Sequence, residues 1–298
     1  MSSASVGVGF SAAGFYFPYH CGVWEHLVRT GVMRADTPTA GASAGSLVAA
    51  MHACGLTPSD GTRILSDVLA RCRKEGVVGK VGNILEDALR KELPRDAHVR
   101  CSKGNLFVSI SSPRVVFGEA ERAANGGSAF ALDGEIVSEF ESFDDLVGAL
   151  LASCHIPLYC GWPARRYRGK WCVDGGWHNL TPTPTHASEK IRVCAFPLLD
   201  AWNKAEPGNG KETGDVFARD ASFWAGWGDD DIACRLIAPD AADGVPMLDY
   251  KKTIKWALLP ASDEILEQLV VMGREDAERW AKRSAFASSI DMKKMDVR

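Results

Sequence analysis

Ser43 is the residue whose surroundings most clearly suggest chemistry, because it lies in Gly41-Ala42-Ser43-Ala44-Gly45, a pentapeptide of the form G-x-S-x-G. A serine hydroxyl is a weak nucleophile, and a sharp strand-to-helix turn is one way in which the backbone exposes it at the start of a helix. Gly41 and Gly45 make such a turn possible, and residues 46–54 form an apolar stretch typical of a helix. The pentapeptide therefore predicts a nucleophile elbow, although a simple turn that contains a serine fits the same residues equally well.

A nucleophilic serine needs a base, and the chain offers two kinds of candidate. None of its seven histidines has a sequence context typical of a catalytic triad, although His155 and His178 lie in predicted loops. Asp174 ends a short apolar stretch and is followed by two glycines. A carboxylate at the C-terminal end of a strand can reach a serine on a neighbouring strand, and glycines permit a close backbone approach. Asp-Gly is also a common turn dipeptide, so Asp174 alone does not define a site.

Taken together, these motifs resemble those of the patatin-like phospholipases, and within them the adipose triglyceride lipase group. Ser43 occupies the G-x-S-x-G position of that family, and Asp174-Gly175-Gly176 occupies its D-G-G position. The stretch 156–161 (IPLYCG) is similar to the segment that the lipases carry before the aspartate. After the aspartate, Asn179 and Pro182 are similar to the N-x-P pattern, with a spacing one residue shorter before the asparagine. The resemblance covers residues 6–197.

The resemblance implies a fold, a catalytic pair and an oxyanion loop. The fold is a patatin-like three-layer α/β/α arrangement with a mostly parallel central sheet, and the pair is a Ser43–Asp174 dyad without a catalytic histidine. The backbone amides of Ala12, Ala13 and Gly14 are expected to form the oxyanion hole. Alanine at position 12 and phenylalanine at position 17 depart from the family pattern, because glycines are usual at both positions.

The implied mechanism passes through an acyl group on Ser43, with Asp174 as the base, and requires no metal ion and no organic cofactor. A carboxylate can act as such a base if burial raises its pKa. Four apolar side chains are candidates for lining an acyl-chain channel, although ordinary core packing explains them equally well: Phe15, Phe17, Trp162 and Trp177.

The expected function is that of a lipid acyl-ester hydrolase, of the triacylglycerol lipase or phospholipase A type, acting on a glycerolipid. One alternative is a transacylase that uses the same acyl-enzyme. A second alternative is a catalytically weak regulatory protein of lipid surfaces that kept the fold while its oxyanion loop changed. A third is an α/β-hydrolase with a histidine triad, which the absence of a suitably placed histidine disfavours.

The composition of the chain indicates which partners and which cellular compartment to expect for such a protein. The chain has 298 residues and a net charge of −4, which argues against nucleic acid as a partner. Nine cysteines without metal-binding spacing indicate free thiols in a reducing compartment. A secretory leader and a stretch of ~20 apolar residues are not found in the sequence. We therefore expect a cytoplasmic protein that acts at the surface of a membrane or a lipid droplet.

The order of predicted elements indicates how the chain positions these residues. Strand-like and helix-like stretches alternate over the first 200 residues, which favours a largely parallel sheet flanked by helices. Predicted strands span 6–10, 39–40, 171–174 and 191–196, and a meander of three strands spans 105–111, 114–119 and 135–140. Predicted helices span 18–29, 46–54, 64–74, 84–93, 143–153 and 263–286. We expect a catalytic domain over residues 5–200, followed by an extension over 201–298 with a polar loop at 201–230 and a helix packed on the catalytic domain.

Overall fold

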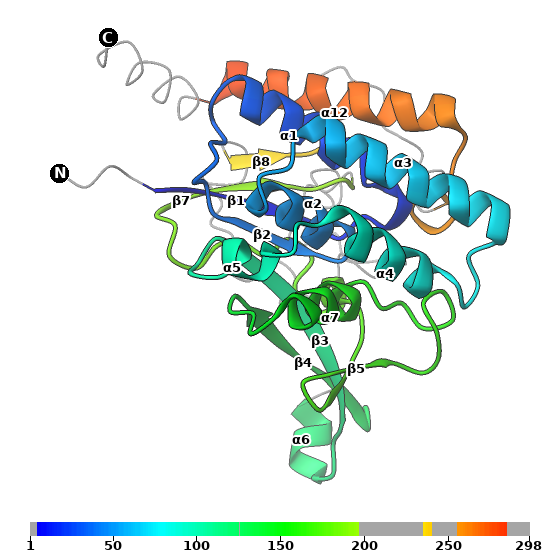
Figure 1. The fold of residues 1–298 in the computed structure, drawn as a ribbon. Helices are drawn as coiled ribbons and strands as arrows, with labels where there is room; N and C mark the ends of the chain where they lie inside the picture. Colours follow the sequence, from blue (N-terminus) through cyan, green and yellow to red (C-terminus); the bar gives the residue numbers. More distant parts are fainter. Residues whose placement is uncertain (1–4, 125, 197–234, 240–254, 285–298) are drawn as a thin grey trace, which may run out of the picture.

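A computed structural model describes residues 5–124, 126–196, 235–239 and 255–284. Within these ranges, helices flank a central sheet of six strands in the order β4-β3-β2-β1-β7-β8 (Figure 1). Every strand pair of this central sheet is parallel except β3 and β4, which are antiparallel. The expected α/β class with a mostly parallel sheet is confirmed. The six strands are β1 (Val6–Phe10), β2 (Thr39–Ala42), β3 (Leu106–Val115), β4 (Phe130–Val137), β7 (Glu189–Val193) and β8 (Leu236–Ile237).

The main helices of the described residues are α1 (Pro18–Arg29), α2 (Ala44–Ala53), α3 (Pro58–Glu75), α4 (Val81–Glu92), α5 (Ala97–Cys101), α6 (Glu119–Ala124), α7 (Phe143–Ser153) and α12 (Asp263–Arg283). Six of them lie where the sequence predicts helices, whereas the short helices α5 and α6 have no predicted counterpart. Ser142 caps α7 through its side chain, which accepts a hydrogen bond from the Asp145 amide, as its position before the helix predicts. Among the described residues, none of the helices combines the length and the hydrophobicity of a membrane-spanning segment.

The predicted three-stranded meander is wrong, because the structure has two long strands there. β3 runs without a break through Pro113 and ends at Val115, so the first two predicted strands are one. α6 begins at Glu119, where the second predicted strand ends, and β4 starts at Phe130, earlier than the third. Proline is tolerated at this point because β2 has already ended, so that no neighbour on that side needs the missing N–H. A separate hairpin is formed by β5 (Arg165–Tyr167) and β6 (Lys170–Cys172), so the predicted strand at 171–174 ends before Asp174.

Helix α12 lies along α1, from which it is separated by more than 230 residues of sequence (Figure 1). Two glycines allow the close approach: a Cβ on Gly22 would lie 2.0 Å from the Val270 carbonyl oxygen, and one on Gly273 would lie 2.1 Å from that of Tyr19. The Tyr19 hydroxyl donates a hydrogen bond of 3.0 Å to Asp276. The polar loop expected at 201–230 lies outside the described residues.

Candidate active site

Ser43 lies at the sharp turn between β2 and α2, with φ of 52° and ψ of −130°. Such a conformation is rare for a residue other than glycine, and strained residues of this kind are frequent at functional sites. The two glycines of the pentapeptide provide the room. A Cβ on Gly41 would lie 2.3 Å from the Gly45 carbonyl carbon, and one on Gly45 would lie 2.4 Å from the Phe10 carbonyl oxygen. The turn therefore requires glycine at both positions.

Hydrogen bonds from both sides hold the Ser43 backbone in this conformation. The Ser43 amide donates to the hydroxyl of Ser153, the last residue of α7, at 2.9 Å. The Ser46 amide and hydroxyl donate to the Ser43 carbonyl at 2.8 and 2.6 Å. Ser153 was not singled out from the sequence, since nothing local marks a residue that acts across the fold.

Asp174 reaches Ser43 because of a β-bridge that extends the sheet past the end of β2. β2 pairs with β3 as far as Ala42 and Ser109. Farther along β3, Ser111 exchanges backbone hydrogen bonds of 2.8 and 3.3 Å with Val173. Val173 thus pairs with β3 just beyond the point where β2 ends. The next residue, Asp174, therefore lies beside Ser43, and its amide donates to the His155 carbonyl at 2.9 Å.

The carboxyl group of Asp174 is buried, with 5% of the residue exposed. Burial raises its pKa from 3.8 to about 6, while the Ser43 hydroxyl and the Gly176 amide act in the opposite direction. Oδ1 accepts a hydrogen bond of 2.9 Å from Gly176, whereas Oδ2 has no partner of good geometry among the described residues. Ser43 and Asp174 are therefore neighbours without a full hydrogen bond, and catalytic contacts are often loose before substrate binds.

The predicted oxyanion loop lies between β1 and α1, and one of its three expected donors is already occupied. The Ala12 amide donates to the Leu180 carbonyl at 2.9 Å, so the prediction that Ala12 is an oxyanion donor does not fit this structure. The amides of Ala13 and Gly14 donate to no acceptor within the described ranges. Gly14 has φ of 54°, and a Cβ there would lie 2.2 Å from the Ala257 carbonyl oxygen. Glycine is therefore required at position 14.

An apolar cavity of about 60 Å³ opens beside Ser43. Phe15 and Phe17 line it, as expected, but Trp162 and Trp177 are 75% and 66% exposed and do not. The expectation for these two tryptophans is wrong, because both side chains face solvent, Trp162 from a loop and Trp177 from the end of the short 3-10 helix Gly175–Trp177. Much of the remaining wall comes from helices that the sequence did not connect with the site, including Leu65 and Val68 of α3 and Val81 and Leu85 of α4. The loop after α7 contributes Ile156, Tyr159 and Cys160.

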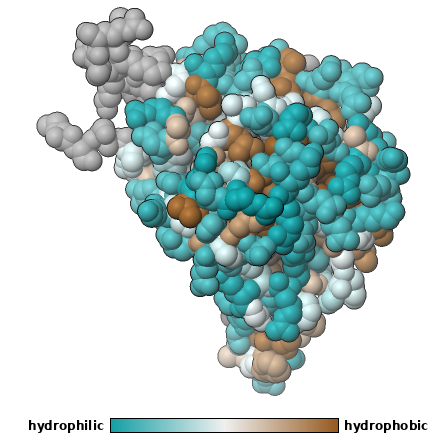
Figure 2. All heavy atoms as spheres, in the orientation of Figure 1, coloured by the Kyte–Doolittle hydropathy of each residue, from teal (hydrophilic) through white to brown (hydrophobic). Residues whose placement is uncertain are grey.

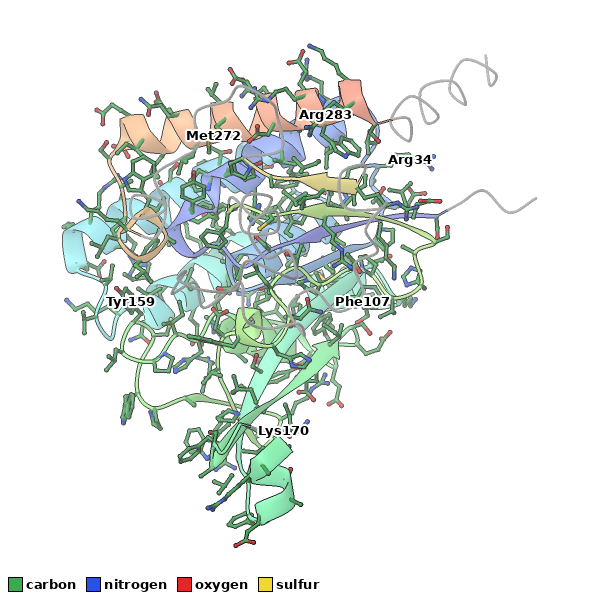
Figure 3. The ribbon with its side chains drawn as sticks, turned by 180° about the vertical axis from the view of Figure 1, so that it is seen from behind. Arg34, Phe107, Tyr159, Lys170, Met272 and Arg283 are labelled. Carbon is green, nitrogen blue, oxygen red and sulfur yellow. The ribbon has the colours of Figure 1, made fainter. Side chains whose placement is uncertain are left out.

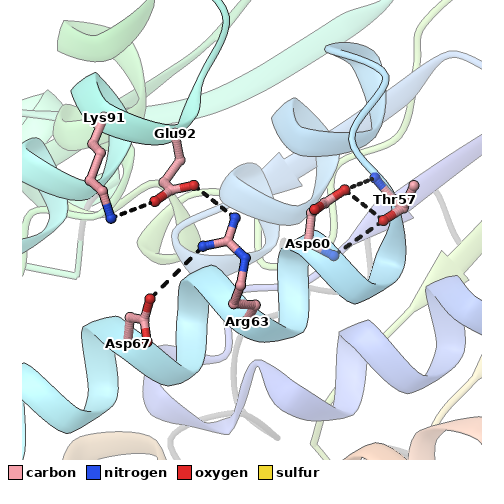
Figure 4. A network of polar contacts seen from close by, with 6 residues as sticks. All are labelled: Thr57, Asp60, Arg63, Asp67, Lys91 and Glu92. Atoms are coloured by element: carbon pink, nitrogen blue, oxygen red, sulfur yellow. Dashed lines mark hydrogen bonds and ion pairs between the residues drawn. The ribbon is translucent and has the colours of Figure 1, made fainter.

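A second apolar cavity, of about 20 Å³, lies behind the first and shares Leu47, Leu65, Val68 and Leu85 with it. Glu92 lies at its polar end. The Glu92 carboxylate binds Arg63 at 2.8 Å and Lys91 at 2.9 Å, and these ion pairs lower its pKa to about 2 (Figure 4). The two cavities thus form an apolar row between α2, α3 and α4 that ends at an ionic cluster.

Neither of the two histidines that the sequence offers as a base, His155 and His178, forms an ion pair with any of the described residues. His155 is buried, with its pKa lowered by burial, and its Nε2 has no hydrogen-bond partner among the described residues. His178 packs over Gly134 of β4, where a Cβ would lie 1.7 Å from the imidazole ring.

His20 was not predicted, yet it supports the oxyanion loop from behind. Its Nε2 donates to the Ser11 carbonyl at 2.9 Å, and burial lowers its pKa to about 4. The Ser11 hydroxyl in turn donates to the Ala12 carbonyl at 2.9 Å and accepts from the Ala195 amide at 3.1 Å. No group of three or more acidic, histidine or cysteine side chains suitable for a metal ion occurs in the described residues.

The mostly parallel sheet, the strained serine at the end of β2 and the buried aspartate beside it define an α/β protein of the patatin type. The family model described as patatin-like phospholipase matches residues 10–185, more than half of the chain, and the chain therefore belongs to this family.

Three relatives share this region. The chain is 31% identical to the omega-hydroxyceramide transacylase of Mus musculus, over 63% of the chain and 30% of the relative. It is 32% identical to the 1-acylglycerol-3-phosphate O-acyltransferase Pnpla3 of Mus musculus, over 63% of the chain and 43% of the relative. It is 31% identical to patatin-like phospholipase domain-containing protein 2 of Rattus norvegicus, over 59% of the chain and 34% of the relative. The matches thus span less than half the length of each of these relatives.

Proposed function

We propose that the protein is a lipid acyl-ester hydrolase, of the triacylglycerol lipase or phospholipase A type, which uses Ser43 and Asp174 through an acyl-serine intermediate. The observation that carries this proposal is the strained serine beside a buried carboxylate of raised pKa, at the mouth of an apolar cavity. An apolar cavity suits a fatty acyl chain, and a carboxylate with a pKa near 6 is a better base than one in water.

In the first half of the reaction, the Ser43 hydroxyl attacks the ester carbonyl carbon while Asp174 accepts its proton. The oxygen that becomes negatively charged faces the amides of Ala13 and Gly14, and the N-terminus of α2 adds a favourable field. The intermediate collapses, the bond to the alcohol oxygen breaks, and the alcohol leaves with the proton from Asp174. Ser43 then carries the acyl group.

In the second half, Asp174 takes a proton from water as the water oxygen attacks the acyl carbon. The bond to Ser43 breaks, the proton returns to the serine oxygen, and a fatty acid leaves. The substrate is a glycerolipid ester held at the surface of a membrane or a lipid droplet.

A transacylase is the second candidate, and the relatives named as a transacylase and an acyltransferase favour it. The first half of the reaction is the same. The hydroxyl of a second lipid then takes the place of water, which requires that this alcohol reach the acyl-serine faster than water does.

The proposal can be tested with one soluble ester, p-nitrophenyl butyrate, and a serine-directed organophosphonate. We expect turnover and labelling of Ser43, and both should disappear in Ser43→Ala. If the unmodified protein neither turns over the ester nor reacts with the organophosphonate, the proposal is wrong and the reading as a catalytically weak regulatory protein replaces it. Product analysis with mixed-acyl phospholipids and triacylglycerols, with and without a lipid alcohol, separates hydrolysis from transacylation.

A further inference from the structure

Around the mouth of the serine cavity, apolar side chains from three separate segments are exposed to solvent. They are Val78, Leu158, Trp162, Leu258 and Leu259, which together we call the rim. Building on the proposed function, we infer that the rim is the face by which the protein docks on the surface of a lipid aggregate that carries the substrate.

Backbone hydrogen bonds join two of these segments at the cavity. The Gly79 amide donates to the Leu158 carbonyl at 2.7 Å, and the Val81 amide donates to the Tyr159 carbonyl at 3.2 Å. Val81 and Tyr159 line the cavity, so their neighbours Val78 and Leu158 lie at its edge.

The third segment reaches the same mouth from the C-terminal part of the chain. Leu258 lines the cavity, and Ala257 lies against Gly14 of the oxyanion loop. Each rim residue thus lines the cavity itself or lies within three residues along the chain of one that does, namely Val81, Tyr159, Cys160 or Leu258. We therefore treat the rim as one surface beside the cavity that contains Ser43.

Leu158 provides an independent indication that this surface has a function. It has φ of 74°, a conformation that is unfavourable for a branched apolar residue, and it is 62% exposed. Its amide donates to the Gly161 carbonyl at 2.9 Å, which holds the turn in this shape. Exposure and backbone strain both argue against leucine here on grounds of stability, which points to a role outside the folded chain.

The position of the rim favours a lipid surface over a protein partner. A protein docked over the rim would cover the opening to Ser43. A lipid aggregate contains the substrate, so an ester can pass from it into the cavity without crossing water. Trp162 is 75% exposed, and an amphipathic indole ring is well suited to the boundary between lipid and water.

The molecule has a second exposed apolar surface that serves as a matched comparison. Phe117 is 85% exposed next to α6, and Phe130 of β4 is also exposed. Figure 2 shows brown surface at the lower tip of the molecule, where the hairpin of β3 and β4 ends. In Figure 3, Tyr159 lies beside α3 and α4, whereas Lys170 lies lower, above α6. The hairpin tip is thus remote from the cavity mouth, and no residue of it lines the cavity.

The test measures flotation with a trioleoylglycerol emulsion coated with phosphatidylcholine, using Ser43→Ala so that no substrate is consumed. Trp162→Asp combined with Leu158→Asp should lower the affinity for the emulsion by at least about 10-fold, because two charged groups would have to enter the interface. Phe117→Asp, the matched control, should leave the affinity within about 2-fold. Unchanged binding in the double variant, or an equal loss in Phe117→Asp, would overturn the inference.

Leu158→Gly is a second variant, in which a loss of binding cannot be attributed to unfolding. Glycine accepts a positive φ, so this variant should be at least as stable as its parent in urea while its affinity for the emulsion falls. A stable Leu158→Gly protein that binds as well as its parent would contradict the role of Leu158. Since binding is measured without turnover, it also separates the two proposals: failure of the proposed function would appear as no turnover of the soluble ester, with docking intact.

Discussion

The Ala12 side chain packs against Gly176, so closely that a Cβ on Gly176 would lie 2.6 Å from the Ala12 Cβ. The family pattern leads one to expect glycine at position 12, and alanine is accommodated because glycine at position 176 leaves room for its methyl group. Ala12 is also not among the described residues with positive φ, so the backbone does not need glycine there. The contact joins the oxyanion loop to the turn that carries Asp174.

Gly176→Ala should therefore reduce both stability and turnover. The new methyl group would meet Ala12 and the Asp174 carboxylate, and overpacking of this kind costs about 1–3 kcal/mol. Adding Ala12→Gly should recover part of the loss, with a coupling energy of about 1 kcal/mol in urea denaturation of the four proteins of the cycle. Strictly additive single effects would show that the two positions do not share this contact.

Ser43→Gly is expected to stabilise the fold while it removes activity. The positive φ of Ser43 costs on the order of 1–3 kcal/mol, and glycine relieves this strain. Ser43→Ala is the matched control, because it removes the hydroxyl but keeps a Cβ. The free energy of unfolding should be higher for the glycine variant than for the alanine variant. If the order is reversed, the backbone at the turn is not strained.

Asp174→Asn should abolish turnover and change how stability depends on pH. The folded-state pKa of about 6 lies above the unfolded value of 3.8, so the contribution of Asp174 to stability is fully present below pH 3.8 and is lost as pH rises through 6. The asparagine variant should match the unmodified protein in stability at low pH and exceed it above pH 6, by at most about 3 kcal/mol. Turnover of the unmodified protein should rise as pH increases through the same range, since the ionised form is the base.

His155→Ala serves as the comparison for that experiment. In the dyad mechanism, its effect on turnover should be much smaller than that of Asp174→Asn. If His155→Ala abolishes turnover and Asp174→Asn does not, a histidine base replaces the dyad.

His20 is expected to act on turnover through the oxyanion loop. His20→Leu removes the hydrogen bond to the Ser11 carbonyl and should lower kcat by at least about 10-fold with little change in KM, because the loop acts on the transition state. His20→Gln retains a donor and should recover part of this loss. Equal activity of both variants would mean that packing, and not the hydrogen bond, positions the loop.

Val68 lines both apolar cavities, so we expect it to limit the length of the acyl chain that the site accepts. Val68→Phe fills the passage between them and should lower kcat/KM for a p-nitrophenyl laurate ester by at least about 10-fold, while the butyrate ester changes by less than about 2-fold. Val271→Phe, at an exposed position of α12, is the control for the added ring. A parallel loss for both esters would place the acyl chain elsewhere.

Local patterns in the sequence are sufficient to predict many of the helices and strands. α1 and β1 have the predicted bounds because proline starts the helix and a short apolar stretch forms the strand. α3 begins at Pro58, earlier than the predicted residue 64, because Thr57 and Asp60 form a capping box before its apolar face begins (Figure 4). The first turn of that helix is polar, so hydrophobic periodicity alone misses it.

The site depends on contacts that no local pattern contains. Asp174 was assigned from a resemblance, and its place beside Ser43 results from the bridge between Ser111 and Val173. The free and occupied amides of the oxyanion loop could not be distinguished either, because the acceptor for Ala12 comes from Leu180, far along the chain. The assigned roles of Ser43, Asp174, Ala13 and Gly14 remain predictions, as does the division of the chain at residue 200.

The close packing of α12 on α1 determines where the chain can be truncated without exposing buried residues. A fragment cut to the family match, residues 10–185, would leave Gly22 and Tyr19 facing water where Val270, Gly273 and Asp276 now lie. It would also lack Ala257, whose carbonyl oxygen lies against Gly14, and Leu258, which lines the serine cavity. The smallest fragment worth expressing therefore extends through Arg283.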